Sequence, residues 1–193
     1  MVGEDPFALF GAWYGEAEKA EPNDPNGMVL ATATPDGRPS ARMVLLKGWD
    51  KDGFVFYTNL ESRKGVELAA NVHVALLFHW KSLRRQIRIE GAAAAVTAAE
   101  ADAYFATRPR LSRLGAWASD QSRVMESKAS LTAKVAALEL RYVVGEIPRP
   151  PHWSGFRVTP EAFEFWQDMP FRLHDRTLFR REGEQWRTEK LYP

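Results

Sequence analysis

The sequence predicts a mainly antiparallel β protein with flanking helices, an α+β fold whose twisted strands tend to close into a barrel. Short β-rich segments in the first half of the chain are separated by two hairpin turns, Pro35-Asp-Gly37 and Asp50-Lys-Asp-Gly53. Between about residues 97 and 142 the apolar residues follow a helical instead of a strand period, which indicates a helical insertion. The chain of 193 residues therefore suits a single domain, residues 1–193.

An amphipathic helix is expected at about residues 5–20, because Asp5-Pro6 is a favourable helix start and apolar residues follow at helical spacing. Five strands are expected next, at residues 28–34, 41–49, 54–58, 72–80 and 84–96. Thr97-Ala-Ala-Glu100 is a capping box for a helix that Pro109 ends or kinks, and a second helix is expected at residues 130–142. The last strands are expected at residues 155–159, 162–166, 177–181 and 186–192.

Composition and charge exclude several classes of protein. The chain has no cysteine, which excludes disulfides and thiol catalysis, and its four histidines form no His-x-x-x-His pair, so no metal site is expected. A net charge of +1 leaves no basic field of the kind that nucleic-acid-binding proteins use. The sequence has neither a long apolar run nor a secretory leader, which predicts a cytoplasmic protein.

The segment from Glu164 to Arg176 concentrates cationic and aromatic side chains beside a polar turn. If it is extended, Arg172, His174 and Arg176 share one face, because alternate residues of a strand point to the same side. Such a face suits a flat anion. The alternative is a solvent-exposed edge strand whose charges form interstrand ion pairs.

A second group of residues suits a phosphate. Ser62-Arg-Lys-Gly65 follows the predicted strand that contains Tyr57 and Thr58, and it opens a short helix with Ser62 as the N-cap. A hydroxyl, two cations and free backbone N–H groups at a helix start form a phosphate cradle, although this is no Walker loop.

Two further patterns are weaker. Tyr104, Arg108 and Ser112 are spaced by four, so that all three can face one pocket and bind a phosphate monoester, or Arg108 can simply satisfy the end of the helix. Arg42 and Lys47 flank an apolar run and point to opposite faces of a regular strand. Either each of them binds a different ligand, or they are only the cationic ends of a core strand.

Together these segments resemble the pyridoxine (pyridoxamine) 5'-phosphate oxidases over nearly the whole chain. The shared segments are Arg42-Met-Val-Leu-Leu-Lys47, Phe56-Tyr-Thr58, Ser62-Arg-Lys-Gly65, Arg85-Gln86, Tyr104-Phe-x-x-Arg108, Gly115-Ala-Trp-Ala-Ser119, Gln121-Ser122, Pro150-Pro-x-Trp153 and Phe165-Trp-Gln167 with Arg172-Leu-His-Asp-Arg176. The resemblance implies an FMN-binding split β-barrel and a homodimer with FMN at the subunit interface. It also implies oxidation of pyridoxine and pyridoxamine 5'-phosphates to pyridoxal 5'-phosphate, with O2 as acceptor and hydrogen peroxide as product.

The resemblance implies a role for individual residues. FMN would be held by Arg42, Met43, Val44, Leu45, Lys47, Tyr57, Thr58, Arg63, Lys64, Gln86, Gln121, Ser122, Trp166 and Arg176. The substrate would contact Asp24, Lys47, Tyr104, Arg108, Ser112, Arg172 and His174. Arg172 and His174 are the expected catalytic residues.

The chain also departs from the family pattern. Leu111 stands where a glycine is expected before Ser112, and a side chain there would either crowd the substrate phosphate or shift that turn. No counterpart of the basic and aromatic N-terminal extension of some family members stands before the helix at residues 5–20, so we expect closure over the substrate to be looser or built otherwise. Two alternatives therefore stay open: another split-barrel FMN oxidoreductase, and a non-catalytic protein that binds or carries FMN or pyridoxal 5'-phosphate.

Overall fold

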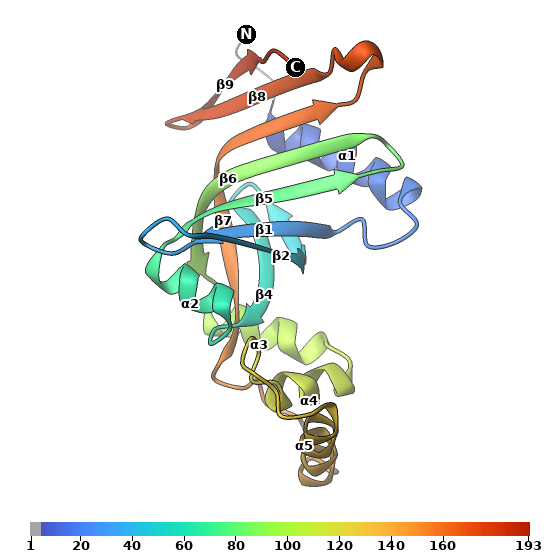
Figure 1. The fold of residues 1–193 in the computed structure, drawn as a ribbon, viewed down its shortest axis with the longest axis vertical. Helices are drawn as coiled ribbons and strands as arrows, with labels where there is room; N and C mark the ends of the chain where they lie inside the picture. Colours follow the sequence, from blue (N-terminus) through green and yellow to red (C-terminus); the bar gives the residue numbers. More distant parts are fainter. Residues whose placement is uncertain (1–4) are drawn as a thin grey trace.

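Residues 5–193, which the computed structural model describes, form a nine-stranded antiparallel sheet with helices at its edges (Figure 1). The strands are β1 (Gly27–Ala33), β2 (Pro39–Leu45), β3 (Gly48–Asp50), β4 (Gly53–Asn59), β5 (His73–Trp80), β6 (Arg85–Ala95), β7 (Trp153–Gln167), β8 (Asp175–Glu182) and β9 (Gln185–Lys190). Their order is β2-β1-β5-β6-β7-β4-β3, with β8 paired to β7 and β9 to β8.

Five α-helices and one 3-10 turn complete the described residues. The helices are α1 (Pro6–Ala20), α2 (Arg63–Ala70), α3 (Ala98–Thr107), α4 (Arg110–Ala118) and α5 (Lys128–Arg141), and the 3-10 turn is η1 (Pro170–Arg172). Helices α3, α4 and α5 gather at the end of the molecule opposite β8 and β9 (Figure 1). None of the helices described in residues 5–193 has the length and apolarity that crossing a membrane requires.

The predicted helix starts are confirmed by their caps. Asp5 Oδ1 accepts a hydrogen bond from Phe7 N at 2.9 Å, and Thr97 accepts one from Glu100 N. Ser62 caps α2 through Gly65 N. Side-chain acceptors at these positions satisfy backbone N–H groups that a helix start leaves without a partner.

Helix α1 supplies the centre of the hydrophobic core. Phe10 is fully buried, and its ring lies 4.8 Å from that of Phe54 and 5.3 Å from that of Phe78. Ala17 is also buried, and Tyr14 packs at the edge of the same core. The amphipathic spacing in the sequence therefore places the apolar face of α1 against the sheet.

The C-terminal half of the sheet differs from the prediction. Instead of separate strands at 155–159 and 162–166, one strand, β7, runs from Trp153 to Gln167 through Pro160. The register with β6 shifts between Glu90 and Gly91, so Pro160 lies at a bulge, where its missing N–H costs no regular ladder bond. A side chain at Gly91 would place its Cβ 2.1 Å from the Thr159 carbonyl oxygen, so only glycine fits this approach.

Two other predictions of secondary structure were wrong. The strand expected at 41–49 ends at Leu45 and resumes at Gly48, and the two residues between them bend the chain. Helix α4 was not predicted, because Pro109 reads as the end of a helix whereas it is the N-cap of the next one. The residues between β2 and β3, and those of α4, border the cavity described below.

A buried carboxylate ties α2 to β1 and β2. Glu67 Oε2 accepts hydrogen bonds from Thr32 Oγ1 and Ser40 Oγ, each at 2.5 Å, and Oε1 accepts one from Arg63 Nε at 2.9 Å. Arg42 Nη2 lies 3.2 Å from Oε2. Burial opposes ionisation of this group, but the three hydrogen bonds and the charge of Arg42 outweigh it and lower the pKa of Glu67 to about 2.

We expect this carboxylate to make the fold sensitive to acid. A pKa lower in the folded than in the unfolded state stabilises the fold above the unfolded value of about 4.3, and the gain disappears as the pH falls toward the folded value. Glu67→Gln should therefore lower the free energy of unfolding at pH 7 by on the order of 2 kcal/mol. Urea unfolding at pH 7, 4 and 3 should show that the difference in the free energy of unfolding between Glu67→Gln and the wild type becomes smaller as the pH falls. A difference that stays constant over this range would contradict the assignment.

Candidate cofactor and substrate site

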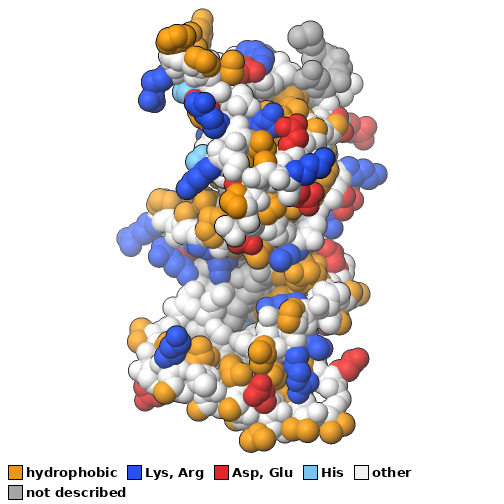
Figure 2. All heavy atoms as spheres, turned by 90° about the vertical axis from the view of Figure 1, so that its right-hand side faces the viewer, with side chains coloured by type: hydrophobic (Ala, Val, Ile, Leu, Met, Phe, Trp, Pro, Cys, Tyr) orange, Lys and Arg blue, Asp and Glu red, His pale blue; other side chains and the backbone are white. Residues whose placement is uncertain are grey.

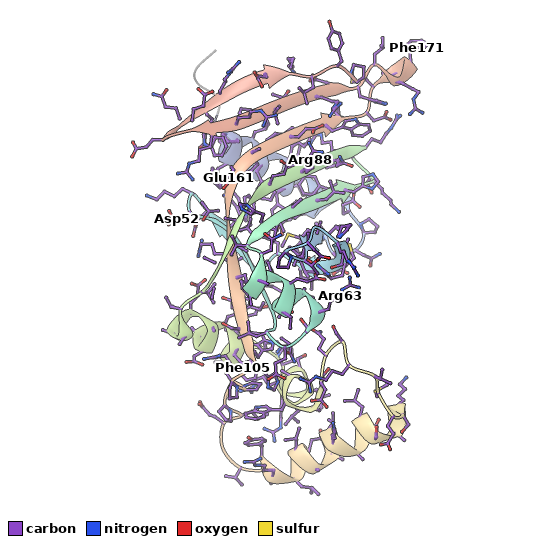
Figure 3. All side chains as sticks on the ribbon, turned by 60° about the vertical axis from the view of Figure 1, so that its left-hand side comes forward. Asp52, Arg63, Arg88, Phe105, Glu161 and Phe171 are labelled. Carbon is purple, nitrogen blue, oxygen red and sulfur yellow. The ribbon has the colours of Figure 1, made fainter. Side chains whose placement is uncertain are left out.

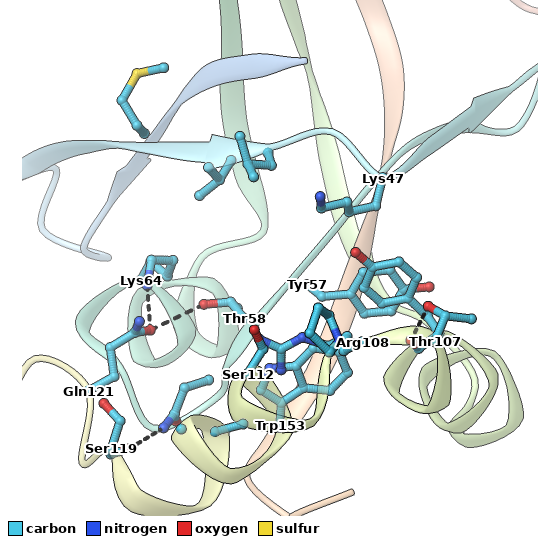
Figure 4. A pocket seen from close by; sticks show the side chains of 18 residues that line it. Lys47, Tyr57, Thr58, Lys64, Thr107, Arg108, Ser112, Ser119, Gln121 and Trp153 are labelled. Atoms are coloured by element: carbon cyan, nitrogen blue, oxygen red, sulfur yellow. Dashed lines mark hydrogen bonds between the residues drawn. The ribbon is translucent and has the colours of Figure 1, made fainter. Parts of the chain in front are cut away.

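A cavity of about 710 Å³ opens between the sheet and the α3–α4 end of the molecule (Figure 4). In the space-filling view the surface is hollowed at this level, and Lys and Arg side chains gather near its edge (Figure 2). Eleven residues that the resemblance implies line this cavity: Met43, Val44, Leu45, Lys47, Tyr57, Thr58, Lys64, Tyr104, Arg108, Ser112 and Gln121. Strand β2, strand β4 and three helices thus bring together residues that are far apart in sequence.

Lys64 provides a buried cation on one side of the cavity. Its Nζ donates hydrogen bonds to Ser62 Oγ at 3.1 Å and to Gln121 Oε1 at 2.9 Å, and both acceptors are neutral (Figure 4). No carboxylate in residues 5–193 forms an ion pair with it. Burial, aided by the nearby charge of Arg42, lowers the pKa of Lys64. A buried ammonium with neutral partners only is stabilised by an incoming anion, so this side fits a phosphate.

Arg108 provides a second cation on another wall of the cavity, on the side where Lys47 lies (Figure 4). Its Nη1 is buried and has no hydrogen-bond partner among the described residues. Burial lowers the pKa of Arg108. Because an unsatisfied buried donor is costly, this guanidinium also fits an anion. Tyr104 and Ser112 line the same cavity, which confirms only that the spacing of four brings these residues together.

Leu111 does not crowd this region. Its side chain is 65% exposed and does not line the cavity. Successive residues of a helix project in different directions, so Leu111 does not share the direction of Ser112. Of the two effects considered for Leu111, crowding of the phosphate is not seen, and the chain at this position is helical instead of forming the expected turn.

Three predicted residues lie around this cavity without lining it. Arg42 donates to Thr32 Oγ1 at 2.5 Å and to the Leu30 carbonyl at 3.1 Å and pairs with Glu67, so its side chain is held against β1. Arg63 pairs with the same carboxylate. Ser122 has a positive φ of 72° in the loop after α4 and lines a neighbouring cavity of about 430 Å³.

Four of the other predicted residues form a separate group on the sheet, which we call the strand cluster: Gln86, Trp166, His174 and Arg176. Gln86 pairs with Trp166 across β6 and β7, and Trp166 pairs with Arg176 across β7 and β8. Directly opposite residues project from the same face of a sheet. The His174 ring lies 4.7 Å from that of Trp166. A buried carboxylate, Glu164, holds Arg176 through contacts of 2.7 and 2.8 Å.

Distance along β7 keeps the strand cluster away from the cavity of the same chain. Trp153, at the first residue of β7, lines the cavity, and Trp166 lies thirteen residues further along the strand. At about 3.3 Å per residue this is a separation of roughly 40 Å along the strand, well beyond the reach of one small ligand. Figure 3 agrees, since the labelled Phe171 lies near one end of the molecule and Phe105 toward the other.

The predicted extended segment, in which Arg172, His174 and Arg176 would share one face, was wrong at Arg172. Phe171 and Arg172 both have positive φ, 59° and 62°, in the turn η1, and the strand begins only at Asp175. This turn exposes Arg172, which has no ion pair within the part of the chain that the structure describes. His174 Nδ1 instead lies 3.0 Å from Asp168 Oδ1 and 3.2 Å from Met169 N.

Asp24 lies on the loop before β1 and does not line the cavity. Its φ is 43°, and its carbonyl accepts a hydrogen bond from Gly27 N at 2.7 Å. Two buried cavity residues had no predicted role, Asn59 and Trp153. Trp153 stands in a segment that the resemblance includes, but its contact with Arg108 exists only in the fold.

The donor set decides which ligands this arrangement can hold. Among residues 5–193 no group of three His, Asp or Glu side chains could hold a metal ion. Two cations on different walls, the buried Lys64 and the half-buried Arg108, suit two phosphates. The apolar residues 43–45 beside them suit a planar ring system. FMN fits the Lys64 side of such a cavity by charge and by hydrogen-bond donors.

Comparison with known proteins agrees with this description. The pyridoxamine 5'-phosphate oxidase family matches residues 15–142, and the pyridoxine 5'-phosphate oxidase C-terminal dimerisation region matches residues 153–193. The pyridoxine/pyridoxamine 5'-phosphate oxidase of Gluconobacter oxydans is 68% identical, over 98% of this chain and 94% of its own length.

Two solved structures share the fold. PhzG from Burkholderia lata, determined with tetrahydrophenazine-1-carboxylic acid, has a TM-score of 0.93 and 34% identity, over 99% of this chain and 94% of its own. An FMN-binding protein from Nostoc punctiforme has a TM-score of 0.77 at 16% identity, with both chains fully covered, and so shows the fold alone. The predicted split-barrel fold is confirmed. The chain belongs to the pyridoxine/pyridoxamine 5'-phosphate oxidase family, whose enzymes use FMN.

Proposed function

We propose that this protein oxidises pyridoxine 5'-phosphate and pyridoxamine 5'-phosphate to pyridoxal 5'-phosphate with FMN as cofactor and O2 as acceptor. The observation that carries the proposal is a pair of cations that line one cavity and have no carboxylate partner among the described residues: the buried Lys64 and the half-buried Arg108, whose Nη1 is buried. FMN and the vitamer each carry one phosphate. Binding of one phosphate to each cation offsets the free-energy cost of removing that cation from water. The oxidase relative that is 68% identical supports the same reaction.

The residues divide between the two ligands. On the FMN side, Lys64 and Gln121 hold the phosphate and the charges of Arg42 and Arg63 add to the field, while β2 residues 43–45 form the wall beside the ring. Lys47, Tyr104, Arg108 and Ser112 receive the phosphate of the vitamer. When bound, FMN would supply the redox chemistry, taking up the hydride from C4' and passing its two electrons to O2 to give hydrogen peroxide. With the amine substrate, water would then hydrolyse the imine to the aldehyde and release ammonia. The chain itself orients both ligands and keeps their phosphates apart.

We further propose that the protein works as a homodimer with FMN at the subunit interface, and that residues 1–193 act as one domain. In this arrangement the strand cluster and Arg172 reach the cavity of the partner subunit. The match of residues 153–193 to a dimerisation region supports the arrangement, since that region contains Trp166, Arg172, His174 and Arg176. Arg172 and His174 then face the pyridine ring, while Asp24 approaches from the loop before β1. A cytoplasmic location stays a prediction.

An anaerobic visible spectrum tests the function. The FMN-loaded protein is mixed with pyridoxine 5'-phosphate without oxygen, and air is then admitted. We expect the flavin band to bleach and then to return with hydrogen peroxide. A band that stays oxidised with both phosphorylated vitamers would contradict the proposal and favour a carrier or another FMN oxidoreductase.

Removal of the buried ammonium should weaken FMN binding. Because a hydrogen bond to a charged group is lost together with its charge, Lys64→Ala should raise the dissociation constant of FMN roughly ten- to a hundredfold. Quenching of flavin fluorescence on titration of the apoprotein measures this constant. Lys51→Ala, at an exposed lysine in the turn before β4, is the control. Equal FMN affinity of both variants would remove Lys64 from the phosphate site.

Arg172 should act on turnover and not on cofactor retention. We expect Arg172→Ala to lower kcat by roughly a hundredfold or more, since it removes a charge placed at the reacting carbon, while the FMN dissociation constant stays within about twofold. Steady-state peroxide production measures kcat, and Arg181→Ala on the same C-terminal segment is the control. Unchanged turnover in Arg172→Ala would exclude this role.

A further inference from the structure

Arg108 differs from Arg149 and Arg157, two arginines of the same region, in the kind of group that holds it. Arg149 pairs with Asp102 at 2.6 Å, and Arg157 pairs with Asp50 at 2.7 Å. The Arg108 guanidinium instead lies over the ring of Trp153, with its carbon 4.9 Å from the ring centroid, and near the ring of Phe105 at 5.7 Å. A π face attracts a cation without neutralising it.

The indole of Trp153 is itself fixed from several sides. Its ring is parallel within 6° to those of Tyr57 and Tyr104, at centroid distances of 5.3 and 6.2 Å. Tyr57 can lie flat there because residue 155 is glycine, where a Cβ would come within 2.6 Å of the tyrosine ring. The three stacked rings and Arg108 therefore form one rigid unit on the cavity wall.

The backbone of Trp153 is pinned to α3. Its carbonyl accepts a hydrogen bond from Arg149 Nη1 at 2.7 Å, and the Nε of the same arginine pairs with Asp102 on α3. Its N–H donates to the Pro150 carbonyl at 3.0 Å. Helix α3 ends at the residue before Arg108, so one ion pair holds the indole and the base of the arginine in a common frame.

We propose that Trp153 is a positioning residue for Arg108, and that its indole face keeps the guanidinium oriented and uncompensated so that the cavity selects phosphorylated over unphosphorylated vitamers. A carboxylate in its place would orient the arginine equally well but would compete with the substrate phosphate. The inference rests on the proposed function for the identity of the ligand.

Binding of a pair of substrate analogues tests the proposal without turnover. The probes are 4-deoxypyridoxine 5'-phosphate and 4-deoxypyridoxine, which lack the oxidisable C4' group, titrated calorimetrically into the FMN-loaded protein. We expect Trp153→Leu to raise the dissociation constant of the phosphorylated analogue about tenfold and that of the unphosphorylated analogue less than about twofold. Trp153→Phe should raise the dissociation constant of the phosphorylated analogue about threefold. FMN affinity should not change. Trp117→Leu, in the same apolar cluster but without a contact to Arg108, should bind both analogues like the wild type.

The Arg108→Ala background separates positioning from a change in cavity shape. There, Trp153→Phe should no longer affect the phosphorylated analogue, because the cation that it orients is gone. Three results would overturn the proposal: Trp153→Phe lowers the affinity for the phosphorylated analogue equally with and without Arg108→Ala, Trp153→Leu lowers the affinity for both analogues equally, or Trp153→Leu binds both analogues like the wild type. If the wild type binds the phosphorylated analogue selectively but oxidises no vitamer, the proposed function fails and the role of Trp153 stands.

Discussion

The constraint on which the rest of this structure depends is a pair of cations with no carboxylate partner among residues 5–193, one of them buried and the other half-buried. Lys64 and Arg108 line the same cavity, and burial lowers the pKa of each. A protein interior tolerates such groups at a cost, which a bound anion removes. The cavity is therefore organised around ligands that bring their own negative charge.

The two buried carboxylates do not line this cavity, since Glu67 lies near it and Glu164 lies against Arg176 of the distant strand cluster. Glu67 forms ion pairs with Arg42 and Arg63 behind β2. Glu164 forms ion pairs with Arg88 and Arg176 on the sheet. Each pairing fixes an arginine that borders a ligand site while leaving the cavity itself without a competing anion. The carboxylates thus orient cations, and the ligands neutralise them.

Much of the fold follows from sequence, and the errors have physical causes. Helix caps and alternating strands were predictable because local hydrogen bonds and local periodicity specify them, as at Asp5, Ser62 and Thr97. The course of β7 through Pro160 was not, since the bulge that accommodates it is set by pairing with β6. Nor were the positive φ angles at Phe171 and Arg172, because neither residue type favours that conformation. The cavity residues were found as a set, whereas the roles of Glu67 and Trp153 arise from contacts between distant segments.

The central claim is that each complete site combines the cavity of one subunit with the strand cluster and Arg172 of the other, and subunit complementation tests it most directly. Arg108→Ala damages the cavity and Arg172→Ala damages the C-terminal contribution, so a mixed dimer of the two has one site with both changes and one with neither. Half of the dimers in an equal mixture are mixed, so refolding the inactive variants together should restore about a quarter of wild-type turnover. Activity no greater than the sum of the two separate variants would show that each site lies within one chain and would contradict the account.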